Sequence, residues 1–157
     1  MVTKKKTWVE KLHDTKDFPR VEIITEKMRK RLGAGTVVIP SPLEVDALMK
    51  SIPMGKLVTI NQIREVLAKK HNATISCPFT TGIFARIAAC AAEEQKQQGI
   101  KNTTPYWRTL RAGGVINPKY PGGTEEQRKL LEQEGHVIIQ KRKNYLVVDY
   151  EKSLVTL

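Results

Sequence analysis

Three stretches in the second half of the chain decide its expected fold: Thr-Pro-Tyr-Trp-Arg-Thr at residues 104–109, Tyr-Pro-Gly-Gly at residues 120–123 and Leu-Leu-Glu-Gln-Glu-Gly-His at residues 130–136. Glycine and proline in and between the first two stretches predict a loop or hairpin. Thr-Glu-Glu-Gln directly after the second stretch is typical of a capping box, which predicts a helix that ends at the Glu-Gly pair of the third. The bulky pair Tyr106 and Trp107 therefore precedes a tight turn that leads into a helix.

In this order the stretches resemble the signature of the alkylguanine-DNA alkyltransferases: Pro-Cys-His-Arg-Val, then Tyr-Ser-Gly-Gly or Pro-Gly-Gly, then a helix that ends in Glu-Gly. Ile-Pro-Met-Gly-Lys-Leu-Val-Thr at residues 52–59 resembles a fourth run of that family, and the resemblance covers about residues 41–148. Ordered runs at such spacing are informative about fold, whereas function depends on the site. Tyr106 holds the place of the family's nucleophilic Cys, and Trp107 the place of its His. The chain therefore looks most like the alkyltransferase-like branch, whose members bind damaged DNA without repairing it.

The patterns before these stretches predict a fold that is mostly α with small β elements. Residues 36–39 are β-prone, and Ser41-Pro-Leu-Glu is a strong helix start because Ser caps and Pro fits the first helical position. A capping box at residues 59–62 begins a second helix that is expected to reach Lys70. A third helix is expected over about residues 82–98, capped by Thr80 or Thr81 and stopped by Gly99.

The order of these helices indicates a DNA-binding architecture. Three helices with a short turn between the second and third predict a helix-turn-helix core. The β-prone segments 137–139 and 145–148 flank Lys-Arg-Lys-Asn and predict a hairpin that would serve as a wing. We therefore expect a winged helix-turn-helix like the DNA-binding domain of alkylguanine-DNA alkyltransferases over residues 36–157.

Residues 1–35 are expected to form a basic helical N-terminal extension. A short helix is predicted at residues 7–12, and a second helix at residues 21–32, whose last turn is rich in Lys and Arg. Such a charge run either contacts DNA or simply lies on a solvated helix end. A contact surface for another protein is a further alternative for this arm.

Composition favours a polyanionic partner. The 157 residues carry a net charge of +11, with a pI of about 9.8, which favours nucleic acid first and an anionic membrane surface second. A solvated basic surface without a partner stays an alternative. No apolar run approaches the ~20 residues that span a bilayer, and no secretory signal is visible, so we expect a cytoplasmic protein that does not bind membranes.

The sequence predicts no catalytic residue, metal site or cofactor. Alkyl transfer requires a thiolate, a base that ionises it and a carboxylate that orients the base. Glu134 matches the family's orienting Glu, but Tyr106 and Trp107 provide neither thiolate nor imidazole. Cys77 and Cys90 have no His at motif spacing, and His71 with Cys77 lacks the further ligands that a metal site needs.

The resemblance also locates candidate DNA contacts. In the family, the third helix enters the minor groove, an Arg at its start replaces a flipped base, and a Tyr at the start of the second helix rotates the nucleotide out. Thr81 aligns with that Arg and Ile60 with that Tyr, which leaves base flipping open because inserted side chains normally offset its cost. Phe84, later in the third helix, is either a core aromatic or an apolar wedge between base steps, and Arg86 is either a phosphate contact or a solvent-facing charge. The predicted DNA-binding residues are Ile60, Asn61, Thr80, Thr81 and Arg86.

A second set of residues is expected to line the pocket where the family's enzymes receive the alkylated base. Aromatic rings there either stack on a base, at about 1–3 kcal/mol each, or fill the vacated active site. Arg108 matches a family Arg that braces the loop. The predicted base-pocket residues are Tyr106, Trp107, Arg108, Tyr120 and Glu134.

The sequence thus predicts a non-enzymatic protein that binds double-stranded DNA and recognises alkylated guanine or otherwise damaged bases for DNA repair, with a repair protein as a further candidate partner. The alternatives are a general winged-helix module that binds nucleic acid without flipping a base, and a divergent methylated-DNA–protein-cysteine methyltransferase that uses Cys77 or Cys90.

Overall fold

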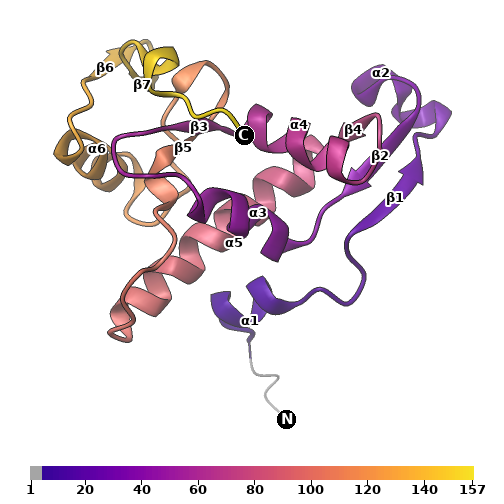
Figure 1. Ribbon diagram of the computed structural model, residues 1–157, viewed down its shortest axis with the longest axis horizontal. Helices are drawn as coiled ribbons and strands as arrows, with labels where there is room; N and C mark the ends of the chain where they lie inside the picture. Colours follow the sequence, from indigo (N-terminus) through magenta and orange to yellow (C-terminus); the bar gives the residue numbers. More distant parts are fainter. Residues whose placement is uncertain (1–4) are drawn as a thin grey trace.

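The computed structural model describes residues 5–157, and helices account for about half of the chain (Figure 1). The α-helices are α1 Trp8–His13, α2 Arg29–Leu32, α3 Pro42–Lys50, α4 Ile60–Lys70, α5 Pro78–Gln97 and α6 Gly123–Gln133. The strands are β1 Arg20–Ile23, β2 Thr36–Ile39, β3 Val58–Thr59, β4 Ile75–Ser76, β5 Thr109–Leu110, β6 Ile138–Lys141 and β7 Asn144–Val147. Short 3-10 turns lie at η1 Glu26–Met28, η2 Tyr106–Arg108, η3 Ala112–Gly114 and η4 Tyr150–Ser153.

The long helix α5 is the centre of the molecule, and α1, α3 and α4 pack against it (Figure 1). Its buried face is rich in alanine, so neighbouring helices approach its backbone closely. Val45 and Met49 of α3 and Ile63 and Leu67 of α4 fill the space around it. The buried alanines of α5 are Ala85, Ala88, Ala89, Ala91 and Ala92.

A second, smaller core lies under the C-terminal hairpin. Leu131 of α6 is buried together with Leu57, Leu110 and Val147, which come from β-elements distant in the sequence. Trp107 contacts both cores and joins them. The loop that carries Tyr106 and Trp107 is therefore fixed from both sides.

Side-chain caps set the starts of α3 and α4. The Ser41 hydroxyl accepts from the Glu44 N–H at 3.2 Å, and the Glu44 carboxylate accepts from the Ser41 N–H at 2.9 Å. Thr59 and Gln62 form the same reciprocal pair at the start of α4, at 3.3 and 2.9 Å. Both predicted helix starts are confirmed.

Small sheets tie the termini to the helical core. In the order β1-β2-β4, β1 is antiparallel to β2 and β2 is parallel to β4, which directly precedes α5. β3 pairs in parallel with β5, and β6 pairs with β7 in the expected antiparallel hairpin, whose turn is Arg142 and Lys143. None of the described helices is both long and apolar enough to cross a bilayer.

The predicted helix over residues 21–32 is wrong. The structure has strand β1, the turn η1 and only one turn of helix, α2, because β-branched Val21 and Ile23 pair with β2 in register. The expected boundary between residues 35 and 36 falls between these two paired strands. The short helix expected at residues 7–12 is confirmed as α1, with Thr7 as its N-cap.

Two other helix starts differ from prediction. α5 begins at Pro78, four residues before the expected start, because Pro fits the first helical turn and Cys77 takes the N-cap position. α6 begins at Gly123, with Gly122 as N-cap at a φ of 79°, so the capping box predicted at residues 124–127 does not form. The predicted loop of residues 105–123 also contains strand β5.

Candidate nucleic-acid interface

Tyr106 fills the space at the centre of the loop of residues 104–109, hereafter the motif loop. Its side chain is buried, and its ring meets the rings of Trp107 and Tyr120 edge to face at centroid distances of 5.4 and 5.5 Å. Burial raises the pKa of both Tyr106 and Tyr120 far above the usual tyrosine range. Both phenols are therefore neutral, and Tyr106 is a packed aromatic side chain with no nucleophilic character.

Glu134 holds the motif loop through a saturated set of hydrogen bonds. Its carboxylate accepts from Arg108 Nη2 at 2.8 Å, from Trp107 Nε1 at 2.7 Å and from the Gly55 N–H at 3.0 Å. Burial alone would raise the pKa of Glu134, but these donors keep it below its ordinary value. Arg108 also donates to the Ile52 carbonyl at 2.7 Å, so both charges of this ion pair are fully used inside the protein.

Gln127 is a buried anchor that the sequence analysis missed. Its amide oxygen accepts from the Asn117 N–H at 2.9 Å, and its amide nitrogen donates to the Trp107 carbonyl at 3.2 Å. The sequence pattern assigned Gln127 to a capping box, so its contacts with Asn117 and Trp107 were not expected. Through Gln127, helix α6 fixes both ends of the segment between Trp107 and Asn117.

A groove of about 760 Å³ lies where α1, the first half of α5 and the segment of residues 111–120 meet. Phe79 and Ile83 on α5 line it and are 51% and 55% exposed, which is high for apolar side chains on a helix. Ile60 lines the groove and Tyr120 contributes to its wall. Exposed apolar side chains that gather in a groove are more common at binding sites than on the rest of a protein surface.

Four basic side chains surround this groove, and no carboxylate lines it. Within residues 5–157, none of the four forms an ion pair with an acidic side chain. A site with uncompensated positive charge at its edge and an apolar floor suits a ligand that is both anionic and flat. The four cations, hereafter the groove cations, are Lys11, Arg86, Arg111 and Lys119.

The predicted DNA contacts divide between this groove and other places. Ile60 and Arg86 line the groove, whereas Asn61 is exposed on α4 outside it. The DNA contact predicted at Thr81 is wrong, because Thr81 is fully buried and its hydroxyl donates to the Cys77 carbonyl at 2.6 Å. The Thr80 hydroxyl is also buried, and Phe84 is a core residue packed edge to face on Phe18 at 5.6 Å.

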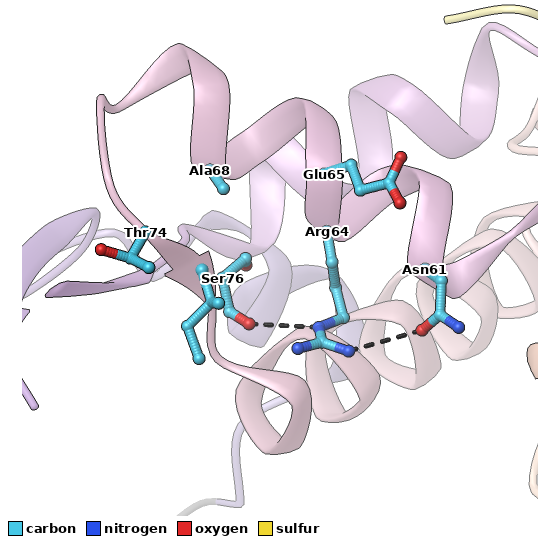
Figure 2. A pocket seen from close by; sticks show the side chains of 7 residues that line it. Asn61, Arg64, Glu65, Ala68, Thr74 and Ser76 are labelled. Carbon is cyan, nitrogen blue, oxygen red and sulfur yellow. Dashed lines mark hydrogen bonds between the residues drawn. The ribbon is translucent and has the colours of Figure 1, made fainter. Parts of the chain in front are cut away.

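Asn61 belongs to a smaller pocket of about 280 Å³ between α4 and β4 (Figure 2). Arg64 crosses this pocket and donates to the Ser76 carbonyl at 3.1 Å and to the Asn61 side chain at 3.4 Å. Glu65 and Thr74 lie at its edges, so the pocket is polar and of mixed charge. The hydrogen bond from Arg64 joins α4 to Ser76 at the end of β4.

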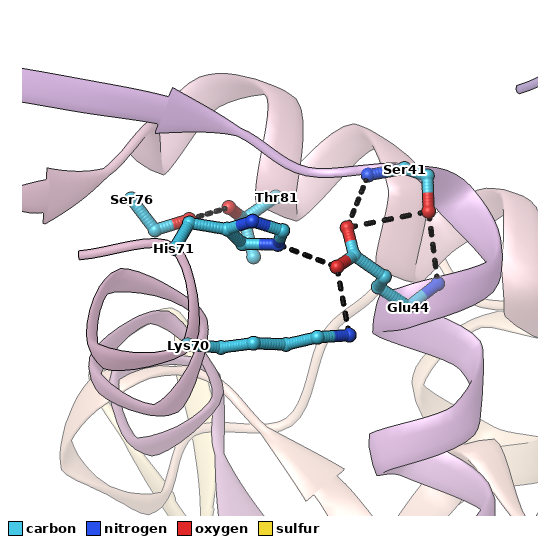
Figure 3. Close-up of polar contacts among 6 residues, drawn as sticks. All are labelled: Ser41, Glu44, Lys70, His71, Ser76 and Thr81. Carbon is cyan, nitrogen blue, oxygen red and sulfur yellow. Dashed lines mark hydrogen bonds and ion pairs between the residues drawn. The ribbon is translucent and has the colours of Figure 1, made fainter. Parts of the chain in front are cut away.

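His71 belongs to a cluster of polar contacts around Glu44 (Figure 3). Its Nε2 contacts Glu44, which also accepts from Lys70 Nζ at 2.9 Å and caps α3 through Ser41. Burial opposes ionisation of Glu44, but these partners hold its pKa below the ordinary value. Among the described residues, no group of His, Cys, Asp and Glu is arranged to bind a metal ion.

The surroundings of Cys90 do not favour a nucleophilic thiolate. Cys77 caps α5 and Cys90 lies in the middle of the same helix, both half-buried and unbridged. Burial raises the pKa of the Cys90 thiol, which disfavours the thiolate that alkyl transfer needs.

Solved structures provide a comparison for this arrangement. The crystal structure of S. pombe Atl1 in complex with damaged DNA containing O6-carboxymethylguanine is similar to this chain at a TM-score of 0.50 and 19% identity, over 74% of this chain and 94% of that one. The chain shares the fold of Atl1. A second crystal structure, of S. pombe ATL in complex with DNA, gives a TM-score of 0.46 and 18% identity over the same shares. No protein-family model and no curated protein matches the sequence.

The similarity to Atl1 supports a fold that is about half helical with small sheets. Several other groove residues were not predicted from the sequence, among them Trp8, Lys11, Phe79, Ile83, Arg111 and Lys119. Trp8 and Lys11 lie near the rest of the groove because α1 docks on α5, and the sequence alone does not indicate this docking. Phe79 was missed because the helix was expected to begin after it.

Proposed function

We propose that this protein is a non-enzymatic, alkyltransferase-like DNA-binding protein that recognises alkylated guanine or other damaged bases in duplex DNA. In this proposal α4 and α5 act as the helix-turn-helix pair, and the β6–β7 hairpin acts as the wing. The observation that carries the proposal is the groove beside α5, with exposed Phe79 and Ile83 on its floor and the four groove cations around it.

The charges of the groove support DNA as the partner. Basic side chains without an acidic neighbour gain most from contact with phosphates, because no internal ion pair has to be broken first. Phe79 and Ile83 project from the first turns of a long helix, so they suit contact with sugars and base edges. The fold shared with Atl1 adds support, since that protein was crystallised with damaged DNA.

The absence of catalysis is supported by the motif loop. Tyr106 packs between two aromatic rings, and Glu134 is bound to Arg108 and Trp107 instead of orienting a histidine. Cys77 and Cys90 lie on α5, outside this network.

Fluorescence anisotropy of labelled duplexes tests the proposal. Duplexes with one O6-alkylguanine should bind more tightly than matched undamaged duplexes, and the affinity should fall with salt. Lys119→Ala should weaken binding to every duplex and reduce the salt slope by about 1, because it removes one phosphate contact. Lys101→Ala is the matched control, since Lys101 is an exposed lysine beyond the far end of α5. Equal affinity for damaged and undamaged duplexes would remove damage recognition, and a flat salt dependence would remove DNA binding.

A second candidate, a winged-helix module that binds nucleic acid without flipping a base, is favoured by one observation. Thr81 holds the position of the family Arg that replaces a flipped base, and it is buried, while Tyr106 holds the position of the family's nucleophilic Cys. A fluorescent base analogue placed at the target position of the duplex distinguishes the two candidates. Emission that rises on binding supports extrusion of the base, and emission that stays quenched supports the second candidate.

Direct alkyl transfer to Cys77 or Cys90 has its own test. Intact-protein mass spectrometry after incubation with O6-alkylguanine DNA should show no added mass. A mass increase on either cysteine would replace the proposed function with that of a divergent transferase.

A further inference from the structure

Helix α1 is attached to α5 by a specific contact at its own N-terminus. The carboxylate of Glu94 on α5 accepts from the Trp8 N–H at 3.1 Å and from the Val9 N–H at 3.2 Å. These are two of the backbone donors that a helix start leaves unpaired. Leu12 is buried in the main core and fixes the other end of α1.

The attachment brings Trp8 into the groove between two of the groove cations. The Lys11 ammonium lies 4.2 Å from the centre of the Trp8 ring, and the Arg86 guanidinium carbon lies 5.5 Å from it. Both distances are within the range of cation–π attraction. Trp8, Lys11 and Arg86 all line the groove, so this cluster joins α1 to the exposed face of α5.

We propose that α1 forms one wall of the nucleic-acid-binding groove, and that Trp8 positions Lys11 and Arg86 for contact with DNA phosphates. This inference rests on the DNA-binding function proposed above. A free Lys or Arg side chain loses rotamer entropy when it binds a phosphate, and a ring that already holds it lowers that loss. The indole also offers an apolar face to a sugar or base at the edge of the groove.

Glu94 and Leu12 hold α1 in place, but neither contact requires an aromatic side chain at position 8. The Glu94 contacts use backbone N–H groups, which any residue at position 8 would supply. The Trp8 ring packs in part against the main core and so contributes to docking, but an aliphatic side chain would serve there as well. What an aromatic ring adds is its contact with Lys11 and Arg86, which is expected for a binding wall. Trp8 is therefore assigned as a positioning residue, and the groove extends beyond the part of the chain that resembles the alkyltransferases.

Anisotropy titrations of three proteins on one duplex test the assignment. Trp8→Leu, which removes the ring, should weaken binding several-fold and reduce the salt slope by about 1 to 2. Trp8→Phe keeps a ring for both cations and should retain most of the wild-type affinity and slope. Urea unfolding of both variants reports any loss of stability separately. Unchanged slope and affinity in Trp8→Leu, whatever its stability, would overturn the assignment.

Tryptophan emission gives a second readout that does not depend on Trp8→Leu folding. The chain has two tryptophans, so DNA-induced quenching seen in the wild type and lost in Trp8→Phe comes from Trp8. Equal quenching in the two proteins would place Trp8 away from the DNA and overturn the inference while the DNA-binding function stands. A wild type that shows no DNA binding would overturn both.

Discussion

The motif loop and the groove beside it use charge in opposite ways. In the loop, Glu134 receives hydrogen bonds from a guanidinium, an indole and a backbone amide, and its side chain is only 8% exposed. In the groove, Arg86 and Arg111 are exposed and have no acidic partner among the described residues. Charges with internal partners contribute to folding, whereas charges without them are available to a ligand. The contrast separates the residues that stabilise the motif loop from the residues whose charge is available to a ligand.

The largest expected effect is the loss of the internal carboxylate. Glu134→Ala leaves the buried Arg108 guanidinium without its counter-ion, and we expect about 3–5 kcal/mol less stability toward urea. Glu132→Ala is the matched control on the same helix, because its ion pair with Arg128 is exposed and worth about 0–1 kcal/mol. Equal losses in the two variants would show that the network around Glu134 is not an internal anchor.

The next effect depends on pH and concerns the second internal carboxylate, Glu44. Because its folded pKa lies below the ordinary value near 4.5, its contribution is present above that pH and is lost as the pH falls toward the folded pKa. Glu44→Gln should therefore cost about 1–2 kcal/mol at pH 7, the scale of a lost cap, and progressively less below pH 4.5. Urea midpoints between pH 7 and 3 measure this difference.

Glu65→Gln is the control for this experiment, because Glu65 is exposed on α4 and forms no ion pair with a described residue. Its effect on the midpoint should be small and should stay nearly constant with pH. A Glu44→Gln difference that does not shrink in acid would mean that the cluster in Figure 3 does not stabilise the charged carboxylate.

The groove should show the reverse behaviour. Arg111→Ala should change stability by less than about 0.5 kcal/mol, as for other exposed positions. It should weaken DNA binding by about 1 kcal/mol at low salt and reduce the salt slope by about 1. Anisotropy and urea unfolding on the same sample measure both. A variant that loses stability but keeps its affinity would place Arg111 with the loop and not with the groove.

The smallest expected effect concerns a buried hydroxyl group that has no hydrogen-bond partner. The Thr109 hydroxyl on β5 is buried and has no hydrogen-bond partner in the structure. Thr109→Val replaces it with a methyl group of similar size, and we expect a gain of up to about 1 kcal/mol without a change in DNA affinity. A loss of stability in urea would show that this hydroxyl has a partner.

Local signals predicted much of the fold. Ser41 and Thr59 began their helices as expected because a capping box is decided within four residues. The helix predicted over residues 21–32 failed because pairing of β1 with β2, a contact between separate segments, outweighed local preference. For the site, the motif run located the aromatic loop, but Trp8 and Arg86 meet only through the docking of α1, which no local pattern encodes. Burial of Thr81 likewise depends on Ser76 and Cys77 in the folded state.

The attachment of α1 to Glu94 has a consequence for synthesis on the ribosome. Trp8 is made 86 residues before Glu94, which at about 5–20 residues per second is a delay of roughly 4–17 s. During that interval the first helix of the nascent chain has no docking surface, and its tryptophan stays exposed to whatever surrounds the emerging polypeptide. The Gln62 side chain also waits for one of its partners, since its amide nitrogen donates to the carbonyl of Val155, 93 residues later. Helix α1 is thus secured long after it is made, and the groove is complete only once residue 120 has been made.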